Sequence, residues 1–216
     1  ASILYHTSLR DSNAIEPLVL PDLRYRKFKK FQKSGLLLRE KYALVGVSRR
    51  DDNSYSRLSA DLELSKSWQT ETGLLVSGTG NLLSAAYIEN KIDKKSNLFK
   101  VYPMGALEFK YPLFKSKAKK TEVLIPIAQL VYSTDTSSSI DPMDEDSSTT
   151  EFDSTTLFKL RKIPGIDRQE KGLRLNAGLL YFYEHKNNYK YSVSLGQVYR
   201  NKNSKDFLLS SGLNGY

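Results

Sequence analysis

Two neighbouring segments of the chain alternate between apolar and polar side chains, and this alternation constrains the fold more than any other feature. In both 172–183 and 189–200, the residues at alternate positions are mostly apolar. Strand side chains point alternately to opposite faces, so each segment is predicted to be a strand with one apolar face. Only residues 185–188 remain to connect them, which predicts an antiparallel hairpin.

The apolar faces of this hairpin have tyrosines near their ends and aliphatic residues in the middle. Such a face fits the inside of a water-soluble sandwich or the lipid-facing outside of a membrane barrel, where aromatic girdles lie at the two interfaces. Alternation alone does not decide between the two. For a barrel, the predicted lipid-facing residues are Leu175, Leu179, Val193 and Leu195, and the predicted lumen-facing residues are Arg174, Asn176, Ser192 and Ser194.

The same strand pattern recurs along the chain, with polar turns between the segments and no helical period of useful length. It predicts about nine strands. Within 54–65 the polar face carries Arg57, Asp61 and Glu63. That face is too charged for a protein interior and is expected to contact water. The predicted strands are 15–28, 35–48, 54–65, 71–87, 99–113, 121–132, 172–183, 189–200 and 207–216.

The predicted strands are long, and their connections alternate in length. Strands of about ten to fifteen residues exceed the five or six typical of soluble domains and suit a tilted bilayer crossing. If the long connection 133–171 lies on one side, the short turns 67–70, 115–120 and 185–188 all lie on the other. Outer-membrane barrels have this asymmetry. The predicted fold class is therefore all-β, an antiparallel transmembrane β-barrel, with this chain as a fragment of a larger barrel.

Composition removes several other classes. The chain of 216 residues has no cysteine, which excludes disulfides, zinc thiolates and a cysteine nucleophile within it. No apolar run approaches the ~20 residues of a transmembrane helix. The net charge of +9 could indicate nucleic-acid binding, but the lysines cluster at predicted turns, so we expect no nucleic-acid partner. No signal peptide is recognisable, which predicts a cytosolic protein or one whose beginning is missing.

The connection 133–171 is far longer than an ordinary loop, so it is either functional or disordered. Its first half has the composition of a solvated loop, whereas its second half is too apolar to remain in water. We expect the second half to fold back onto the barrel as a lid or plug. Pro164 and Gly165 would form its turn, and Asp167 and Arg168 would anchor it to polar groups of the lumen. The alternative is an external loop with an incidental Asp167–Arg168 ion pair.

The chain has no convincing catalytic or metal-binding pattern. The acidic residues 141–146 could hold calcium, but they lack the glycine and terminal glutamate of an EF-hand, so a solvated loop is the preferred interpretation. His6 and His185 are the only histidines, and neither belongs to a triad pattern. We therefore predict no enzyme activity, no catalytic residue, no metal and no cofactor.

Several spaced motifs, in order over roughly residues 15 to 213, resemble the barrel of the LPS-assembly protein LptD, also called organic solvent tolerance protein OstA, particularly its alphaproteobacterial branch. Arg161-Lys162-Ile163 stands where that family usually has Asn-Arg-Phe. The matching motifs are Leu20-Pro-Asp-Leu-Arg24, Arg57-Leu58, Tyr102-Pro-Met104, Tyr111-Pro-Leu113, Ile125-Pro-Ile-Ala-Gln-Leu-Val131, Ile140-Asp-Pro-Met-Asp-Glu-Asp-Ser147, Phe152-Asp153, Leu157-Phe158, Pro164-Gly-Ile-Asp-Arg168, Glu170, Gly172, Arg174, Asn176, Gly178-Leu179, Leu195-Gly-Gln-Val-Tyr-Arg200 and Ser211-Gly-Leu213.

The resemblance implies lipopolysaccharide assembly in the outer membrane of a Gram-negative cell. It implies a barrel that opens laterally to the outer leaflet, an LptE-type lipoprotein plug, a periplasmic Lpt bridge protein and contact with outer-membrane lipid. Residues 1–216 would be a partial outer-membrane β-barrel domain that lacks the family's periplasmic jellyroll. The alternatives are a porin-like diffusive channel and a soluble glycan-binding β-sandwich.

Overall fold

Every regular element of the described chain is a β-strand, which confirms the predicted all-β class. The computed structural model describes residues 2–5, 18–48, 54–91, 94–134, 146 and 156–201. Its strands are β1 Ser2–Tyr5, β2 Leu18–Lys30, β3 Leu37–Ser48, β4 Ser54–Gln69, β5 Leu75–Lys91, β6 Lys94–Lys110, β7 Leu113–Lys117, β8 Lys120–Ser133, β9 Gly172–His185 and β10 Lys190–Arg200.

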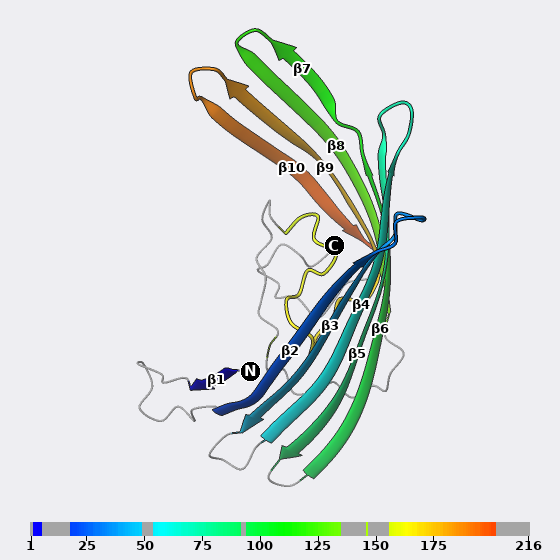
Figure 1. Ribbon diagram of the computed structural model, residues 1–216, viewed down its shortest axis with the longest axis vertical. Coiled ribbons are helices and arrows are strands. Elements are labelled where there is room, and N and C mark those ends of the chain that lie inside the picture. The colour runs from blue at the N-terminus through cyan, green and yellow to red at the C-terminus, as the bar shows by residue number, and fades with distance from the viewer. Residues whose placement is uncertain are drawn as a thin grey trace.

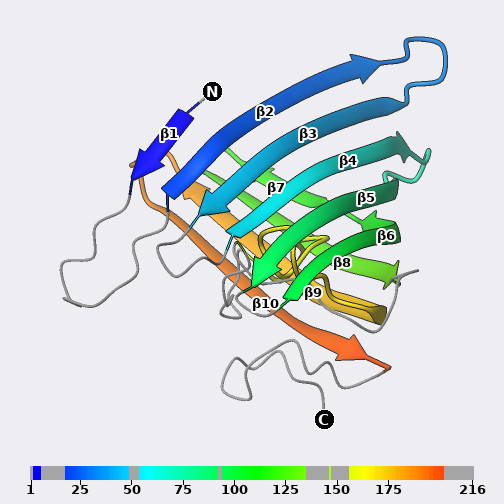
Figure 2. The same ribbon diagram turned by 90° about the horizontal axis from the view of Figure 1, so that it is seen from below.

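All strand pairs are antiparallel, and they form one open sheet in the order β1-β2-β3-β4-β5-β6-β8-β9-β10. The sheet curls strongly, so that β8–β10 face back toward β2–β5 across a hollow (Figures 1 and 2). Among the described residues, β1 and β10 form its two edges. An open, curved, antiparallel sheet is consistent with the predicted barrel fragment.

The predicted hairpin 172–200 is confirmed as β9 and β10. The two strands pair without a register shift, from Lys190 opposite Glu184 to Arg200 opposite Arg174. The turn closes through a hydrogen bond from the His185 amide to the Tyr189 carbonyl, 2.9 Å long. Asn188 takes a positive φ of 62° in this turn, a conformation that asparagine tolerates better than most residues.

One predicted strand, 99–113, is interrupted. β6 ends at Lys110, β7 begins at Leu113, and both strands pair with β8. Proline has no amide proton to donate to a ladder, and Pro112 lies in this break. β1 was not predicted, and the predicted strand 207–216 lies outside the described residues.

The sheet has one apolar and one polar face. Register and alternation place the exposed apolar side chains of neighbouring strands together on the convex face. Tyr183 and Tyr191 stack there beside the β9–β10 turn, with ring centroids 4.6 Å apart. Exposed aliphatic residues of this face include Leu44, Leu58, Leu82, Leu107, Leu130, Leu175 and Leu195.

No helix in the described part of the chain has the length and apolarity of a membrane span.

Candidate functional site

Residues 156–171, called the inner segment below, lie in the hollow of the sheet. They contain no strand and no helix, and their trace runs along the concave face between the two arms of the curve (Figures 1 and 2, yellow). The side chains that meet this segment come from β3, β4, β5, β8, β9 and β10. The candidate site is therefore built by a loop packed on strands that are far from it in sequence.

Two glycines make room for the apolar start of the inner segment. Gly178 of β9 and Gly196 of β10 are paired in register, so the concave face has no side chain at either position. A Cβ atom on Gly178 would lie 2.8 Å from Cζ of Phe158, and one on Gly196 would collide with Leu157. Leu157 is buried and Phe158 half-buried. These side chains thus occupy space that only glycine leaves free.

Beside the glycines, two amides of the sheet form a hydrogen-bonded chain that reaches the inner segment. Nδ2 of Asn176 donates to Oε1 of Gln129 at 2.6 Å. Nε2 of Gln129 donates to the carbonyl of Phe158 at 3.0 Å and to Glu108 at 2.9 Å. Asn176 is completely buried, so its amide needs such partners. These hydrogen bonds hold the backbone of the inner segment against β8.

Glu170 connects the end of the inner segment to a pair of arginines on β9 and β10. Arg200 Nε lies 2.6 Å from Oε1 of Glu170, and Arg174 pairs with the other carboxylate oxygen. Arg174 also donates to the carbonyl of Leu160 at 2.9 Å. All three charged side chains are at least nine-tenths buried, so the pairing offsets a large desolvation cost.

Lys162 is a buried residue of the inner segment, with only 1% of its surface exposed. Its Nζ donates to the carbonyl oxygens of Thr156 and Leu157. Burial and repulsion by Arg174 and Arg200 lower the pKa of Lys162 to about 7. The protonation of this lysine is therefore sensitive to pH near neutrality.

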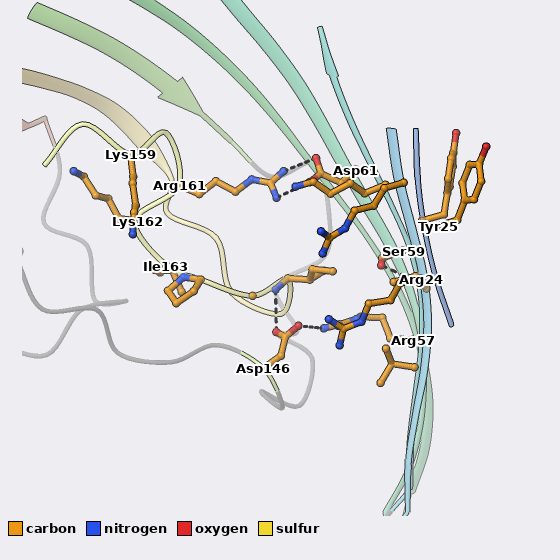
Figure 3. A pocket seen from close by; sticks show the side chains of 18 residues that line it. Arg24, Tyr25, Arg57, Ser59, Asp61, Asp146, Lys159, Arg161, Lys162 and Ile163 are labelled. Carbon is orange, nitrogen blue, oxygen red and sulfur yellow. Dashed lines mark hydrogen bonds and ion pairs between the residues drawn. The ribbon is translucent and has the colours of Figure 1, made fainter. Parts of the chain in front are cut away.

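Arg161 reaches from the inner segment to β4 and β5. Its Nη2 lies 3.0 Å from Oδ1 of Asp61 (Figure 3). The same Nη2 donates to Oδ1 of Asn81 at 2.5 Å. Asn81 in turn donates to Asp61 at 2.7 Å. Arg161 and Lys162, which occupy the positions where this chain departs from the motif of the resembling family, are thus both used in packing.

Asp167 connects the inner segment to β4 through buried polar contacts. One of its oxygens accepts hydrogen bonds from the Tyr55 hydroxyl and from Nη1 of Arg57, each 2.6 Å long. Asp167 is 2% exposed and Arg57 is 5% exposed. Next to it, Ile166 packs on a cluster of buried side chains from β3, β4 and β5. This cluster consists of Val47, Tyr55, Ala85 and Tyr87.

The predicted turn at Pro164-Gly165 is held by a residue from the earlier part of the long loop. Gly165 has a positive φ of 94°, and a Cβ at this position would lie 2.5 Å from the Asp146 carbonyl oxygen. The Asp146 carboxylate accepts the Ile166 amide at 2.9 Å and pairs with Arg57 at 2.6 Å. Only glycine combines this backbone conformation with this close approach.

The structure brings some predicted site residues together and separates others. Arg174 and Asn176 contact the inner segment, whereas Ser192 and Ser194, also on the concave face, make no side-chain hydrogen bond to its described residues. Arg168 is exposed. The predicted lipid-facing residues are on the convex face, where Leu175, Val193 and Leu195 are exposed and Leu179 is half-buried.

One expectation from the sequence is wrong. The polar face of 54–65 was expected to contact water, but Arg57 and Ser59 are buried because the inner segment and Asp146 cover them. Of the predicted acidic group 141–146, only Asp146 lies within the described residues, and it pairs with Arg57. No group of side chains in the described ranges has a metal-binding arrangement.

Sequence reasoning missed the partners of the inner segment. Tyr55, Arg57 and Gln129 lie more than twenty-five residues away from it in sequence, and nothing local marks them as partners. The available signal was the placement of charged or amide side chains, such as Arg57 and Gln129, on the polar face of a strand.

Comparison with known proteins gives one match over nearly the whole chain. Residues 4–215 match the family model described as LptD: LPS transport system D. A search of curated proteins found no match.

Proposed function

The chain belongs to the LptD family of lipopolysaccharide-transport proteins, and from this we infer that it forms one wall of a transport barrel, closed on its inner side by the inner segment. The family is an outer-membrane family of transport and assembly proteins, not of enzymes. Residues 1–216 would form part of its barrel domain, with the long loop 133–171 supplying a lid or plug.

The observation that carries this proposal is the chemical contrast between the two faces of one sheet. Leucines are exposed on the convex face of neighbouring strands, which suits lipid chains. The concave face carries Arg57, Asn81 and Arg174 and is covered in part by the inner segment. The stacked Tyr183 and Tyr191 rings would lie at one membrane interface, where aromatic residues are favoured.

The inner segment is proposed to restrict the lumen while it is docked on the concave face. It is attached at three separated places, through Gly178 and Gly196, through Glu170 and through Asp167. Two of these attachments are charge pairs, whose groups can exchange partners for water or other polar groups, whereas Leu157 and Phe158 form an apolar contact that favours the docked position. The segment is proposed to move between a docked and a released position.

Other parts of the proposal rest on the family. These are the location of this chain in the outer membrane, the lateral opening to the outer leaflet, the LptE-type plug and the periplasmic bridge protein. The resemblance to OstA-type members of the alphaproteobacterial branch also remains a prediction.

Crosslinking in whole cells tests the lid. In a full-length protein that is the only copy in the cell, a Leu157→Cys/Gly196→Cys pair should crosslink through a short reagent, because a Cβ atom at position 196 would meet residue 157 and cysteine at 157 is shorter than leucine. The crosslink should lower the amount of lipopolysaccharide at the cell surface, and cleaving it should restore that amount. Leu157→Cys paired with Val193→Cys, on the convex face, is the matched control and should not crosslink.

A second readout uses an impermeant thiol reagent. Leu157→Cys should be labelled far more slowly than Ser138→Cys in the polar half of the long loop. Equal labelling rates, or equal crosslinking of the two cysteine pairs, would contradict the lid.

A further inference from the structure

A basic pocket lies between the inner segment and β2–β4, and it shares Arg57, Asp61 and Arg161 with the anchoring contacts described above. Its volume is about 430 Å³, within the range of about 300–1,000 Å³ that is common for small-molecule sites. Ile163, Pro164 and Ile166 line the pocket from the segment and give it an apolar side. Tyr25 points away from this space, on the opposite side of the sheet (Figure 3).

Basic side chains line this pocket from both of its walls. The sheet contributes Arg24, Arg26, Lys41 and Arg57. The inner segment contributes Lys159, Arg161 and Lys162. The only carboxylates in the lining are Asp61 and Asp146.

Ion pairs leave a surplus of positive charge in the pocket. Asp61 is shared by Lys41 and Arg161, and Arg57 is held by Asp146 and Asp167. Arg24 pairs with Asp22 just outside the lining. Among the described residues, the other three lining cations have no carboxylate within salt-bridge distance. These are Arg26, Lys159 and Lys162.

Two buried cations of the lining are incompletely compensated. Arg57 is 5% exposed, and its Nε has no hydrogen-bond partner among the described residues. Lys162 is bound only by carbonyl oxygens, and burial lowers its pKa to about 7. A buried donor without a partner and a buried charge without a counter-ion are both costly, so an anion in the pocket would relieve both.

We propose that this pocket binds a phosphate monoester group of a saccharide ligand, and that the bound group holds the inner segment against β2–β4. A phosphate monoester carries about −1.5 to −2 charges at neutral pH and three accepting oxygens, which match a surplus of several cations better than one carboxylate does. The apolar side formed by Ile163 and Pro164 offers a surface for a sugar ring. Because Arg26 belongs to the sheet and Lys159 to the inner segment, a ligand that bridges them favours the closed segment.

This inference rests on the proposed function, since it concerns a group on the transported class of molecule. It goes further by assigning a particular subsite and by coupling its occupancy to the position of the segment. The same phosphate chemistry is offered by a sugar phosphate and by free inorganic phosphate, and the test separates these sources.

The test measures binding to the full-length protein in lipid nanodiscs by isothermal titration, with N-acetylglucosamine 1-phosphate, inorganic phosphate and unphosphorylated N-acetylglucosamine as probes. We expect the sugar phosphate to bind more tightly than inorganic phosphate and the neutral sugar to bind least. Arg26→Gln/Lys159→Gln should weaken binding of the sugar phosphate about tenfold, and raising the salt concentration should weaken it further. Both replaced side chains are exposed, so the fold should tolerate the change.

Lys27→Gln/Lys186→Gln is the matched control. It removes two exposed charges, one from the neighbouring position of β2 on the opposite face and one from the β9–β10 turn, and it should leave binding unchanged. In the wild type, bound sugar phosphate should also slow tryptic cleavage after Lys159 and Arg161. Unphosphorylated N-acetylglucosamine should not slow this cleavage.

Three results would overturn the proposal. These are equal binding of the phosphorylated and neutral sugars, unchanged binding in Arg26→Gln/Lys159→Gln, and tighter binding of free phosphate than of the sugar phosphate. If the purified wild-type protein shows no phosphate binding while cells that depend on it still place lipopolysaccharide at their surface, the pocket fails and the transport function stands. If surface lipopolysaccharide does not depend on the protein at all, the proposed function itself fails.

Discussion

The carboxylate of Asp167 lies 2.6 Å from Nη1 of Arg57, although 110 residues separate the two in sequence. Both side chains are buried, and the hydroxyl of Tyr55 donates to the same carboxylate oxygen. A buried ion pair is a weak source of net stability, but removing one partner leaves the other charge without compensation. This pair therefore determines where the inner segment is attached to β4.

Replacing Asp167 by Asn should release the end of the inner segment. Loss of one partner of a buried pair costs about 3–5 kcal/mol, and we expect the lower end because Asp146 still pairs with Arg57. Hydrogen exchange of the amides of residues 163 and 165–169 should become faster while that of β4 stays slow. Glu184→Gln, which breaks an exposed pair with Lys190, is the control and should cost about 1 kcal/mol or less. Similar exchange in both variants would contradict this assignment.

Gly178→Ala should displace the beginning of the inner segment. The new methyl group would lie 2.8 Å from Cζ of Phe158 and 2.5 Å from the carbonyl oxygen of Leu195, so overpacking should cost about 1–3 kcal/mol. Proteolysis within 156–160 should accelerate, and Phe158→Ala in the same protein should recover part of the loss. Gly105→Ala is the control, because no atom lies within 4 Å of its added methyl group. If both glycine substitutions accelerate proteolysis equally, the loss of stability comes from the sheet and not from the contact with the segment.

Docking of the inner segment should strengthen as pH rises above neutral. The pKa of Lys162 is lowered to about 7 when the segment is docked, and released lysine has its ordinary value of 10.5. The released state thus binds more protons between these values, so docking gains up to about 1.4 kcal/mol per pH unit in this window and gains nothing below it. Arg174, Arg200 and Lys159 repel the charged form of Lys162, and Glu170 pairs with the two arginines.

A spin label at Pro164→Cys measures this pH dependence through its mobility. The immobile fraction should grow from pH 7 to pH 9, and Lys162→Gln should flatten the curve. A pH profile that is the same with and without Lys162 would remove this lysine as the cause.

The two faces of β10 should respond differently to charge. Leu195 is exposed on the convex face, and a lysine there should cost about 2–4 kcal/mol if that face contacts the membrane midplane. Ser194→Lys, at the adjacent position on the concave face, is the matched control and should be mild. The measurement is the yield of heat-modifiable, folded barrel in the outer membrane. Equal yields would argue against the proposed lipid-facing surface.

Sequence alone determined most of the strands and which of their side chains share a face. The period of two in 172–183 and 189–200 predicted β9, β10 and the side on which Leu175 and Arg174 lie, because strand geometry ties position directly to direction. It also identified 133–171 as too long and, in its second half, too apolar for a solvated loop. The family motifs then connected this architecture with lipopolysaccharide transport.

Only the tertiary structure decided what the polar face contacts. Local pattern places Arg57 on a charged face, and that face was expected to be wet, yet Asp167 and Asp146 bury it. The local sequence pattern likewise cannot show that Gly178 and Gly196 together leave space for Leu157 and Phe158. Alternation is a property of neighbouring residues, whereas burial and charge pairing depend on which distant segments the curvature of the sheet brings together.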